Sequence, residues 1–493
     1  MKRFIAILCT LALMLACMPI ALAEEAQPAP KYVFMFIGDG MGNPQVTATQ
    51  YYLGAIENPD SEFPVPADLS FTTFPYLGMV TTYDASSFCP DSASTATSMA
   101  SGEKTLSGVI NYDVTLTTPF KLVAEYAKEA GYKVGVISSV SVDHATPAAY
   151  YAKQPSRNDY YEIAVQGITG STVDYLAGGG FKKPTGADKD NPQPDIMDLA
   201  VENGWNIPAT NEEIRNLNAE SGRVLAINPV LQDSKAIHYE IDRERLAAAG
   251  EDVLSLADFV RSGINVLDNE NGFFMMCEGG KIDWAGHAND AATSIHETMA
   301  LSDAVQVALD FAADHPDETL IIVTADHETG GMTIGFATTA YDTHFTYLTN
   351  QTISFTDFDT VIGELRESGA SFEDALAQIE TCYGLTTEPD KELSLTETEL
   401  DSLKAAFELS MTPADARELG DQEALLYGGY EPLSMAVSHI MNNKAGLSYT
   451  SYAHTGLQIP VYATGVGAEA FSGLYDNTEI FTRTMDVMGL QAD

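Results

Sequence analysis

The chain has 493 residues, a length that suits one large α/β domain with insertions or several smaller domains. Its 70 Asp and Glu residues outnumber 25 Lys and Arg residues, and the formal net charge is −45. This charge repels nucleic acids and anionic membranes, so it argues against both classes of binding partner. Most of the carboxylates are expected to solvate the surface, and a minority are available to bind cations.

The N-terminal segment is expected to direct export. Two basic residues precede a long apolar run, which ends in the Ala-Leu-Ala sequence of residues 21–23, as in a cleaved signal peptide. Residues 1–23 are therefore predicted to be a signal peptide and residues 24–30 a short linker. After cleavage no transmembrane anchor would remain, and the protein would be periplasmic, extracellular or attached to the cell surface. A lipid anchor on Cys17 is the weaker alternative, because apolar residues continue after it.

The cysteines that remain after cleavage are Cys89, Cys277 and Cys382. Their number is odd and their spacing is long. We therefore predict no disulfide framework, one bridge at most, and no cysteine-based zinc site.

The folded body is expected to begin with a buried strand. The apolar run 32–37 leads into the glycine-rich turn 38–42, which contains Asp39. Ligands collect at the C-terminal ends of strands in open parallel sheets, so this turn would bring Asp39 to such a place. Taken alone, Asp39 fits an ordinary turn equally well.

Residues 89–97 read Cys-Pro-Asp-Ser-Ala-Ser-Thr-Ala-Thr and predict a loop that turns into a closely packed helix. Ser92 would lie in its first turn, where unpaired N–H groups and the helix dipole favour a phosphate or an oxyanion. The pair Asp91-Ser92 is equally the pattern of an ordinary helix cap. Without support from the rest of the chain, an ordinary helix cap is the better interpretation of this pair.

Strand and helix signals alternate through the middle of the chain, as in a parallel sheet. Residues 119–130 combine a first-turn Pro, an apolar stripe and a terminal Gly, which predicts a helix, and a strand is expected at 133–138. An apolar stripe predicts a long helix at 290–313. Further strands are expected at 223–227, 272–277, 319–324 and 460–464.

A change of pattern predicts a helical insertion at residues 336–449. Surface helices separated by acidic, Thr-rich loops are expected at 355–379, 396–409 and 434–442. The predicted fold is thus a large, mostly parallel central sheet flanked by helices, with this insertion before the last strand. The catalytic core would comprise residues 31–335 and 450–493, and the insertion would cover the site or mediate association.

Residues of metal-ligand type lie beside three further predicted strands. They are Glu278, Asp283, His287, Asp326, His327 and His454. Asp283 and His287 are four residues apart, so one helical turn would direct both side chains at the same metal. Each residue alone is more often structural than a ligand, but together with Asp39 they indicate a metal centre.

Several segments resemble, in order, the motifs of the alkaline phosphatase family. They are residues 38–42, 91–97, 143–148, 178–180, 278–287, 324–327 and 454–456. The resemblance covers about residues 31–335 and 450–485, and it does not cover the predicted insertion. It implies an alkaline phosphatase-like fold and an exported, zinc-dependent phosphomonoesterase that acts on small phosphate monoesters and forms a homodimer.

The resemblance also implies residue roles. Ser92 matches the nucleophile that becomes a phosphoserine, and Arg157 matches the arginine that clamps the phosphate. Two zinc ions and one magnesium ion are implied. The first zinc would be held by Asp283, His287 and His454, the second by Asp39, Asp326, His327 and Ser92, and magnesium by Asp39, Thr146 and Glu278. His144, beside the magnesium site, and Trp284 stand where some members have Asp, and Lys or His, respectively.

The implied chemistry needs these residue types. A serine hydroxyl is a weak nucleophile, and coordination to zinc lowers its pKa. Two metals suit an in-line displacement at phosphorus, and an arginine fork binds two phosphate oxygens.

Three other functions remain open at this level. A sulfatase of the same superfamily would need a Cys-x-Pro-x-Arg arrangement, which residues 89–92 do not provide. A phosphodiesterase would need a pocket for a second ester group, for which the insertion is available. A non-catalytic metal- or phosphate-binding protein would not need Ser92.

Overall fold

The computed structural model describes residues 29–492, and every structural statement below concerns this part of the chain. The predicted signal peptide, Cys17 and most of the linker lie outside it. Within it, no helix has the length and apolar character needed to cross a membrane. Cys89, Cys277 and Cys382 are all free thiols.

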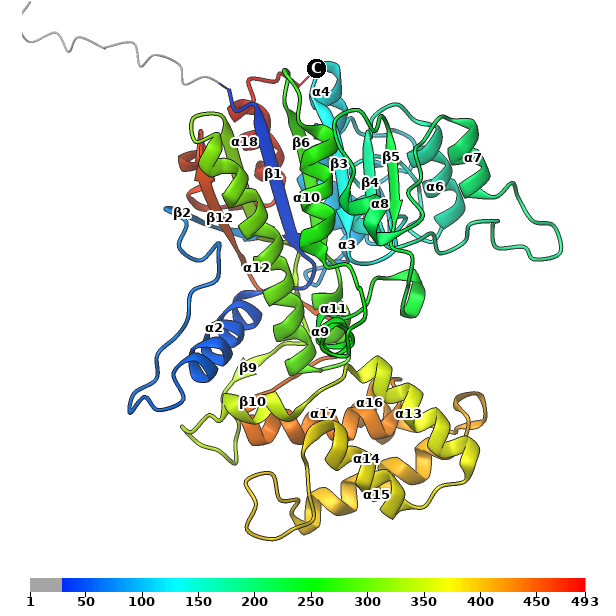
Figure 1. Ribbon diagram of the computed structural model, residues 1–493, viewed down its shortest axis with the longest axis vertical. Helices are drawn as coiled ribbons and strands as arrows, with labels where there is room; N and C mark the ends of the chain where they lie inside the picture. Colours follow the sequence, from blue (N-terminus) through cyan, green and yellow to red (C-terminus); the bar gives the residue numbers. More distant parts are fainter. Residues whose placement is uncertain (1–28, 493) are drawn as a thin grey trace, which may run out of the picture.

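A nine-stranded sheet forms the centre of the molecule, in the order β13-β2-β12-β7-β1-β6-β3-β4-β5 (Figure 1). The strands are β1 (Tyr32–Gly38), β2 (Tyr76–Thr81), β3 (Lys133–Ser138), β4 (Tyr175–Gly178), β5 (Val224–Ile227), β6 (Phe273–Gly279), β7 (Thr319–Ala325), β12 (Ile459–Gly465) and β13 (Gly473–Asp476). In the described chain, the neighbouring strands pair in parallel except β12, which runs antiparallel to β2 and β7. The predicted mostly parallel sheet is confirmed.

The central strands β1, β6 and β7 bury every residue, as their continuous apolar sequences predict. Their register places Gly38 of β1 beside Gly279 of β6 and Ala325 of β7. The three strands therefore end at the same edge of the sheet. Asp39 and Asp326, which directly follow two of these ends, leave the sheet at that edge.

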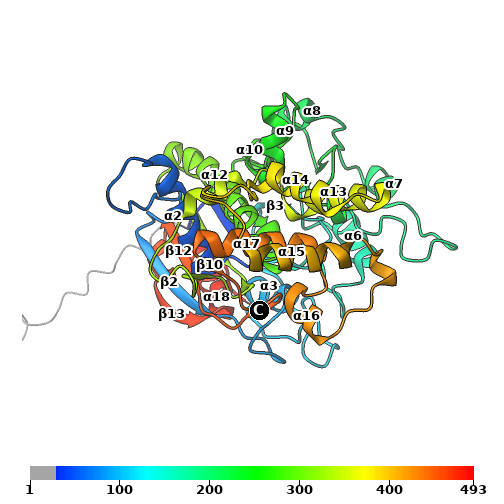
Figure 2. The ribbon, with the colours of Figure 1, turned by 90° about the horizontal axis from the view of Figure 1, so that it is seen from below.

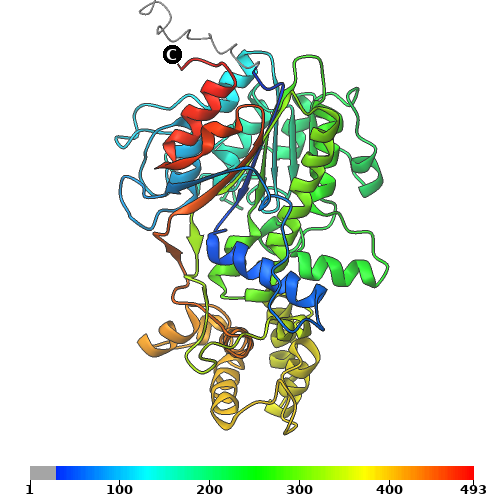
Figure 3. The ribbon, with the colours of Figure 1, turned by 90° about the vertical axis from the view of Figure 1, so that its left-hand side faces the viewer.

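Helices cover both faces of the sheet. On one face lie α10 (Leu256–Leu267) and the long α12 (Ala291–Asp314); on the other lie α3 (Ser92–Ser101), α4 (Val123–Glu129) and α18 (Thr478–Val487). Figure 3 shows the red α18 and the green α12 on opposite sides. The remaining helices of this part are α2 (Asn43–Glu57), α5 (Ala145–Ala148), α6 (Tyr160–Thr169), α7 (Ile196–Glu202), α8 (Asn211–Arg215), α9 (Glu240–Ala248) and α11 (Lys281–His287).

Five further helices gather at one end of the molecule, the lower end in Figure 1, and Figure 2 views the protein from this end. They are α13 (Phe355–Ser368), α14 (Phe372–Tyr383), α15 (Glu397–Ser410), α16 (Asp421–Tyr427) and α17 (Pro432–Ala445). Their apolar side chains form a second core, which also takes in residues of α2, α9, α11 and α12. The helices thus pack directly against the elements that carry the candidate site.

Two short strand pairs join these helices to the rest of the protein. β9 (Thr333–Ile334) pairs with β10 (Leu447–Ser448), and β8 (Glu328–Thr329) pairs with β11 (His454–Thr455), both antiparallel. The chain therefore leaves the sheet and returns to it at neighbouring points.

The structure corrects the predicted helices in three places. The single helix expected at 355–379 is two helices, because Gly369 ends α13 with a φ of +65° and Ser371 caps α14. The helix at 434–442 is not on the surface, since most of α17 is buried. The helix expected from residue 119 begins only at Val123, because Leu122 is its extended N-cap.

Three strands of the sheet are absent from the sequence prediction. β4 has four residues, as does β13, and β2 is partly exposed. Short or half-exposed strands carry little apolar signal, so their place in the sheet depends on their neighbours.

Candidate active site

Ser92 is the first residue of α3. Asp91 caps this helix, because its Oδ1 accepts the N–H of Ser94 at 3.0 Å, and Gly102 ends it with a φ of +78°. All ten helix residues are buried, which their small Ser, Ala and Thr side chains permit. The expected helix with Ser92 in its first turn is confirmed, and the Ser92 hydroxyl takes no part in the cap.

The Ser92 hydroxyl points at a cluster formed by Asp39, Asp326 and His327. Its Oγ lies 3.2 Å from His327 Nε2 and 3.5 Å from Asp39 Oδ1. His327 Nε2 is in turn 3.2 Å from Asp326 Oδ2, and ligand atoms of the three cluster residues lie within 4.8 Å of one another. The ends of β1 and β7 bring this cluster together with the N-terminus of α3.

A second cluster joins Asp283, His287 and His454. The predicted helical turn exists as α11, and His287 Nε2 lies 3.3 Å from Asp283 Oδ2. His454 Nε2 lies 3.1 Å from His287 Nε2 and 3.5 Å from Asp283 Oδ1. Thr329 holds the carboxylate by donating its hydroxyl to Asp283 Oδ1 at 2.5 Å. The two clusters adjoin, since the His327 and His454 rings stack with centroids 3.6 Å apart.

Backbone carbonyls set the orientation of both histidines in the second cluster. His287 Nδ1 donates to the Tyr452 carbonyl and His454 Nδ1 to the Pro90 carbonyl, each at 2.6 Å. These bonds leave the two Nε2 atoms directed at one another and at Asp283. A ligating histidine in proteins is held in this way by a second partner.

Burial opposes ionisation of the carboxylates around Ser92. It raises the pKa of Glu278 to about 7 and that of Asp326 to about 6. It also raises the pKa of Asp39 well above its usual range, and Asp326 and Asp283 add to that shift. At Asp283 burial acts in the same direction, but His287 and the other histidine of its cluster outweigh it and hold the pKa well below its usual range. Anionic groups crowd in a buried space, so this donor set fits metal cations.

A third group of oxygen donors lies on the other side of Asp39. Thr146 donates its hydroxyl to Asp39 Oδ2 at 3.4 Å, and Glu278 Oε2 accepts the Ser138 hydroxyl. Among the described residues, Glu278 Oε1 has no hydrogen-bond partner, although it is buried. An unsatisfied carboxylate oxygen beside a hydroxyl and a second carboxylate suits a hard cation such as Mg²⁺.

His144 lies between this group and Arg157. Its Nε2 is 3.5 Å from Arg157 Nη2, and within the described chain its buried Nδ1 has no partner. Burial, together with the positive charges of Arg157 and Lys182, holds the pKa of His144 well below its usual range. The ring is therefore neutral at physiological pH.

Arg157 is anchored by Asp91. Its Nη1 lies 2.9 Å from Asp91 Oδ2, and its backbone N–H donates to the Gly108 carbonyl at 2.7 Å. Burial opposes ionisation of Asp91, but the guanidinium and the N–H groups of Gly108 and Ser94 outweigh burial and lower its pKa. The residue that caps the Ser92 helix thus also orients the arginine.

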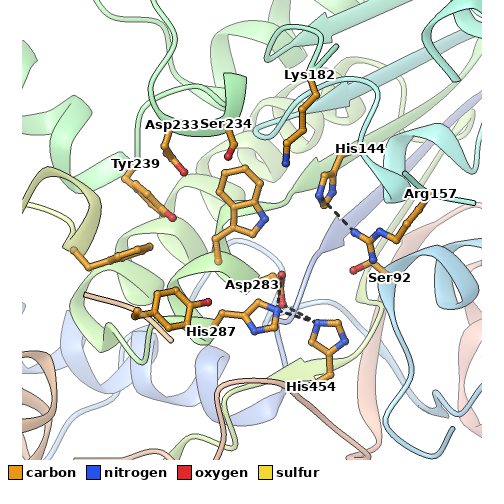
Figure 4. A pocket seen from close by; sticks show the side chains of 13 residues that line it. Ser92, His144, Arg157, Lys182, Asp233, Ser234, Tyr239, Asp283, His287 and His454 are labelled. Carbon is orange, nitrogen blue, oxygen red and sulfur yellow. Dashed lines mark hydrogen bonds and ion pairs between the residues drawn. The ribbon is translucent and has the colours of Figure 1, made fainter. Parts of the chain in front are cut away.

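A pocket of about 500 Å³ opens above these residues (Figure 4). Of the predicted site residues, Ser92, His144, Arg157, Asp283, His287 and His454 line it. Asp39, Asp326 and His327 lie beneath Ser92 and are buried, as are Thr146 and Glu278. The structure therefore brings all the predicted site residues together around one serine.

The family model described as alkaline phosphatase matches residues 30–490. The chain belongs to the alkaline phosphatase family. Alkaline phosphatase 3 of Bacillus subtilis strain 168 is 30% identical over 476 residues, which cover 94% of this chain and 90% of that protein. Alkaline phosphatase 4 of the same bacterium is 29% identical over 461 residues, covering 91% and 86%. Membership of the family identifies the chain as a phosphoric monoester hydrolase.

Solved alkaline phosphatases have the same fold. A cold-active alkaline phosphatase from the psychrophile Shewanella sp. is 27% identical, with a TM-score of 0.74 over 93% of this chain and 99% of that one. A mutant of the TAB5 alkaline phosphatase, whose structure has Mg bound in the M3 site, is 25% identical, with a TM-score of 0.61 over 94% and 100%. The expected alkaline phosphatase-like fold is confirmed.

Six residues that line the pocket are absent from the sequence prediction for this alkaline phosphatase family member. They are Lys182, Asp233, Ser234, Tyr239, Phe355 and Tyr430. Lys182 follows the glycine turn 178–180, which belonged to the resemblance and offered a signal. The others come from segments without a motif, so nothing in the sequence pointed to them.

Proposed function

We propose that this chain is an exported, metal-dependent phosphomonoesterase that uses Ser92 to form a phosphoserine and then releases inorganic phosphate. The observation that carries the proposal is the position of the Ser92 hydroxyl, at a helix N-terminus and 3.2 Å from His327 Nε2, in the first of two adjoining clusters of metal-ligand type. A hydroxyl in such a place is suited to attack rather than to binding alone.

Two zinc ions and one magnesium ion are proposed as cofactors. We assign the first zinc to Asp283, His287 and His454, the second to Asp39, Asp326, His327 and the Ser92 oxygen, and magnesium to Asp39, Thr146 and Glu278 with His144 beside it. Bound metal ions would supply the positive charge that acidifies the serine hydroxyl and balances the phosphoryl oxygens. The buried, mutually repelling carboxylates and the carbonyl-oriented histidines support this assignment.

The reaction would proceed in two displacements. Ser92 Oγ forms a bond to phosphorus as the bond to the ester oxygen breaks, and the alcohol leaves with a proton. Water then attacks the phosphoserine, which releases phosphate and restores the hydroxyl. Arg157 would bind two phosphate oxygens through its planar fork, and Asp91 keeps the fork in place.

The charge of the pocket supports a phosphate ligand. Arg157 and Lys182 bring two cationic side chains to the same cavity as Ser92. The first-turn amides of α3 add the partial positive charge of a helix N-terminus. A phosphate dianion would thus be attracted by two cationic side chains and by the helix N-terminus.

Export and homodimer formation are proposed from the sequence and the family resemblance. Export predicts that the mature protein begins at Glu24, which N-terminal sequencing of the recovered protein tests. Acylation at Cys17 would instead leave a longer mature protein that begins at Cys17. A homodimer predicts twice the monomer mass in analytical ultracentrifugation.

The enzymatic proposal has one decisive assay. Purified protein should hydrolyse a chromogenic phosphomonoester at alkaline pH, lose activity after chelation and regain it with Zn²⁺ plus Mg²⁺. If the protein hydrolysed a matched phosphodiester equally fast or faster, the proposed activity would be that of a phosphodiesterase. Absence of turnover at full metal occupancy would favour a binding protein.

A further inference from the structure

Four aromatic side chains are among the residues that line the pocket; two of them are partly exposed, Trp284 and Tyr430, and the other two are buried. Tyr239 precedes α9 and Trp284 lies on α11, whereas Phe355 begins α13 and Tyr430 precedes α17. We call these four residues the aromatic wall. In Figure 4, Tyr239 lies across the cavity from Ser92 and Arg157.

Three rings of the aromatic wall contact one another. The Phe355 ring packs edge to face against Tyr239, with centroids 5.6 Å apart, and against Tyr430 at 6.2 Å. Trp284 extends the surface toward the phosphate end, where its ring lies 5.9 Å from that of His144. Edge-to-face contacts of this kind fix the ring planes.

A buried cation supports the wall from behind. Lys281 is fully buried, and its Nζ donates to Gln232 Oε1 at 2.9 Å and to the Ile237 carbonyl at 2.8 Å. The same Nζ lies 3.4 Å from the ring centroid of Tyr239 and 5.8 Å from that of Trp284. These two rings are therefore held in place before any ligand arrives, which reduces the entropic cost of binding.

The cavity is larger than a phosphate group needs. Its volume of about 500 Å³ falls within the range of sites for whole small molecules. The phosphate occupies the end with Ser92 and Arg157 in the proposed reaction, so the remaining space is available to the ester's alcohol portion. The aromatic wall, Lys182, Asp233 and Ser234 line that space.

We propose that the aromatic wall binds the leaving group, and that the enzyme prefers phosphate monoesters whose leaving group carries a planar aromatic ring. Aryl, arylmethyl and nucleoside phosphates belong to this class. The inference rests on the proposed phosphomonoesterase function and adds a substrate class to it. Trp284 and Tyr430 are the rings of the wall that a ligand can reach, and Phe355 packs behind them against Tyr430. Such rings discriminate by shape: a flat ring stacks on them, whereas a puckered ring of equal size does not.

The test compares two substrates that differ in ring planarity. Benzyl phosphate and cyclohexylmethyl phosphate release primary alcohols of similar acidity, and the cyclohexyl ring is at least as apolar as the phenyl ring. We expect kcat/KM of the metal-loaded enzyme to favour benzyl phosphate by about fivefold or more, the size of one stacking contact. A ratio near one, or a preference for the cyclohexyl compound, would overturn the inference.

Variants locate the preference on the wall. Phe355→Leu and Tyr430→Leu keep an apolar side chain but remove the ring, and each should lower the benzyl-to-cyclohexylmethyl ratio by about threefold. Tyr347→Leu is the matched control, because Tyr347 belongs to the same helical region and does not line this pocket. Its ratio should equal that of the unmodified enzyme. A ratio unchanged in both wall variants would refute the role of the wall.

Inhibition gives a readout independent of turnover. In the wall variants Ki for benzylphosphonate should rise, while Ki for methylphosphonate, which reaches only the phosphate end, should stay unchanged. A parallel rise of both values would indicate a damaged phosphate end and contradict the assignment. Failure of the unmodified enzyme on every monoester would instead reject the proposed function, so the two failures are distinguishable.

Discussion

Asp91 links the two residues on which phosphate transfer depends. One of its carboxylate oxygens caps the Ser92 helix through Ser94, and the other binds Arg157 at 2.9 Å. The position of the proposed nucleophile and that of the phosphate-binding cation therefore depend on the same side chain. At the scale of single residues, one side chain such as Asp91 therefore positions two parts of the site at once.

Ser92→Ala should reduce kcat by roughly 10⁴- to 10⁶-fold, the loss expected when a nucleophile is removed. Binding of inorganic phosphate should persist, because Arg157 and the α3 amides remain. Steady-state kinetics and a phosphate inhibition constant measure the two effects. Turnover retained in the purified variant would take Ser92 out of its proposed role.

Lys182→Ala should raise KM and Ki for phosphate by about three- to tenfold, because one of the two lysine or arginine cations of the pocket is lost. The neighbouring Lys183 provides the control, because it lines a different pocket. Its Nζ donates to the Asn158 carbonyl at 3.4 Å. Lys183→Ala should leave both constants within error of the unmodified enzyme. Equal effects of the two substitutions would show that only overall charge matters.

At the scale of elements, the sequence predicted the strands that carry ligands, because β1, β6 and β7 are continuous apolar runs that end in acidic residues and glycines. The helical turn of Asp283 and His287 was predictable from spacing alone. The aromatic wall was not, since Phe355 and Tyr430 enter the site only through the packing of α13 and α17 against α11 and α12. The family motifs predicted one set of site residues, which the structure brings together; their roles stay predictions.

Asp359 links α13 to α17 by accepting the Ser434 hydroxyl. Burial raises its pKa to about 7, with a further contribution from the Glu431 charge. The folded state therefore binds this proton more tightly than the unfolded state, whose carboxyl has a pKa of about 3.9. This group favours folding most below pH 4, and its contribution is lost as the pH rises through about 7.

Asp359→Asn should remove that dependence. The difference in the free energy of unfolding, variant minus unmodified protein, should increase by on the order of a few kcal/mol between about pH 4 and pH 8. Denaturant unfolding at several pH values measures the difference. A constant offset across this range would mean that Asp359 does not titrate with folding.

At the scale of the whole molecule, two apolar cores pack against each other, one around the sheet and one among α13 to α17. We propose that residues 336–449 are an insertion into a core of residues 31–335 and 450–493. The pairing of β9 with β10 supports this division, because it brings both ends of the segment together.

The net charge of −45 opposes the approach of a phosphate dianion. Screening should relieve this repulsion, so kcat/KM for an uncharged alcohol's phosphate should rise several-fold between roughly 10 mM and 150 mM salt. Phosphocholine, whose cation offsets one phosphate charge, should show a weaker rise. A fall in kcat/KM with salt would mean that the local cations of the pocket dominate the encounter.

The reversed direction of β12 has a consequence for assembly. Because β12 runs antiparallel to β7, its first residues lie at the catalytic edge, and His454 reaches the site before the strand begins. His454 binds the carbonyl of Pro90, 364 residues earlier in the chain. Contacts between residues this distant in sequence slow folding, because a long loop must close before they form. The proposed first zinc site can therefore be completed only after His454 has been synthesised and has packed against Pro90, so metal loading would follow that step.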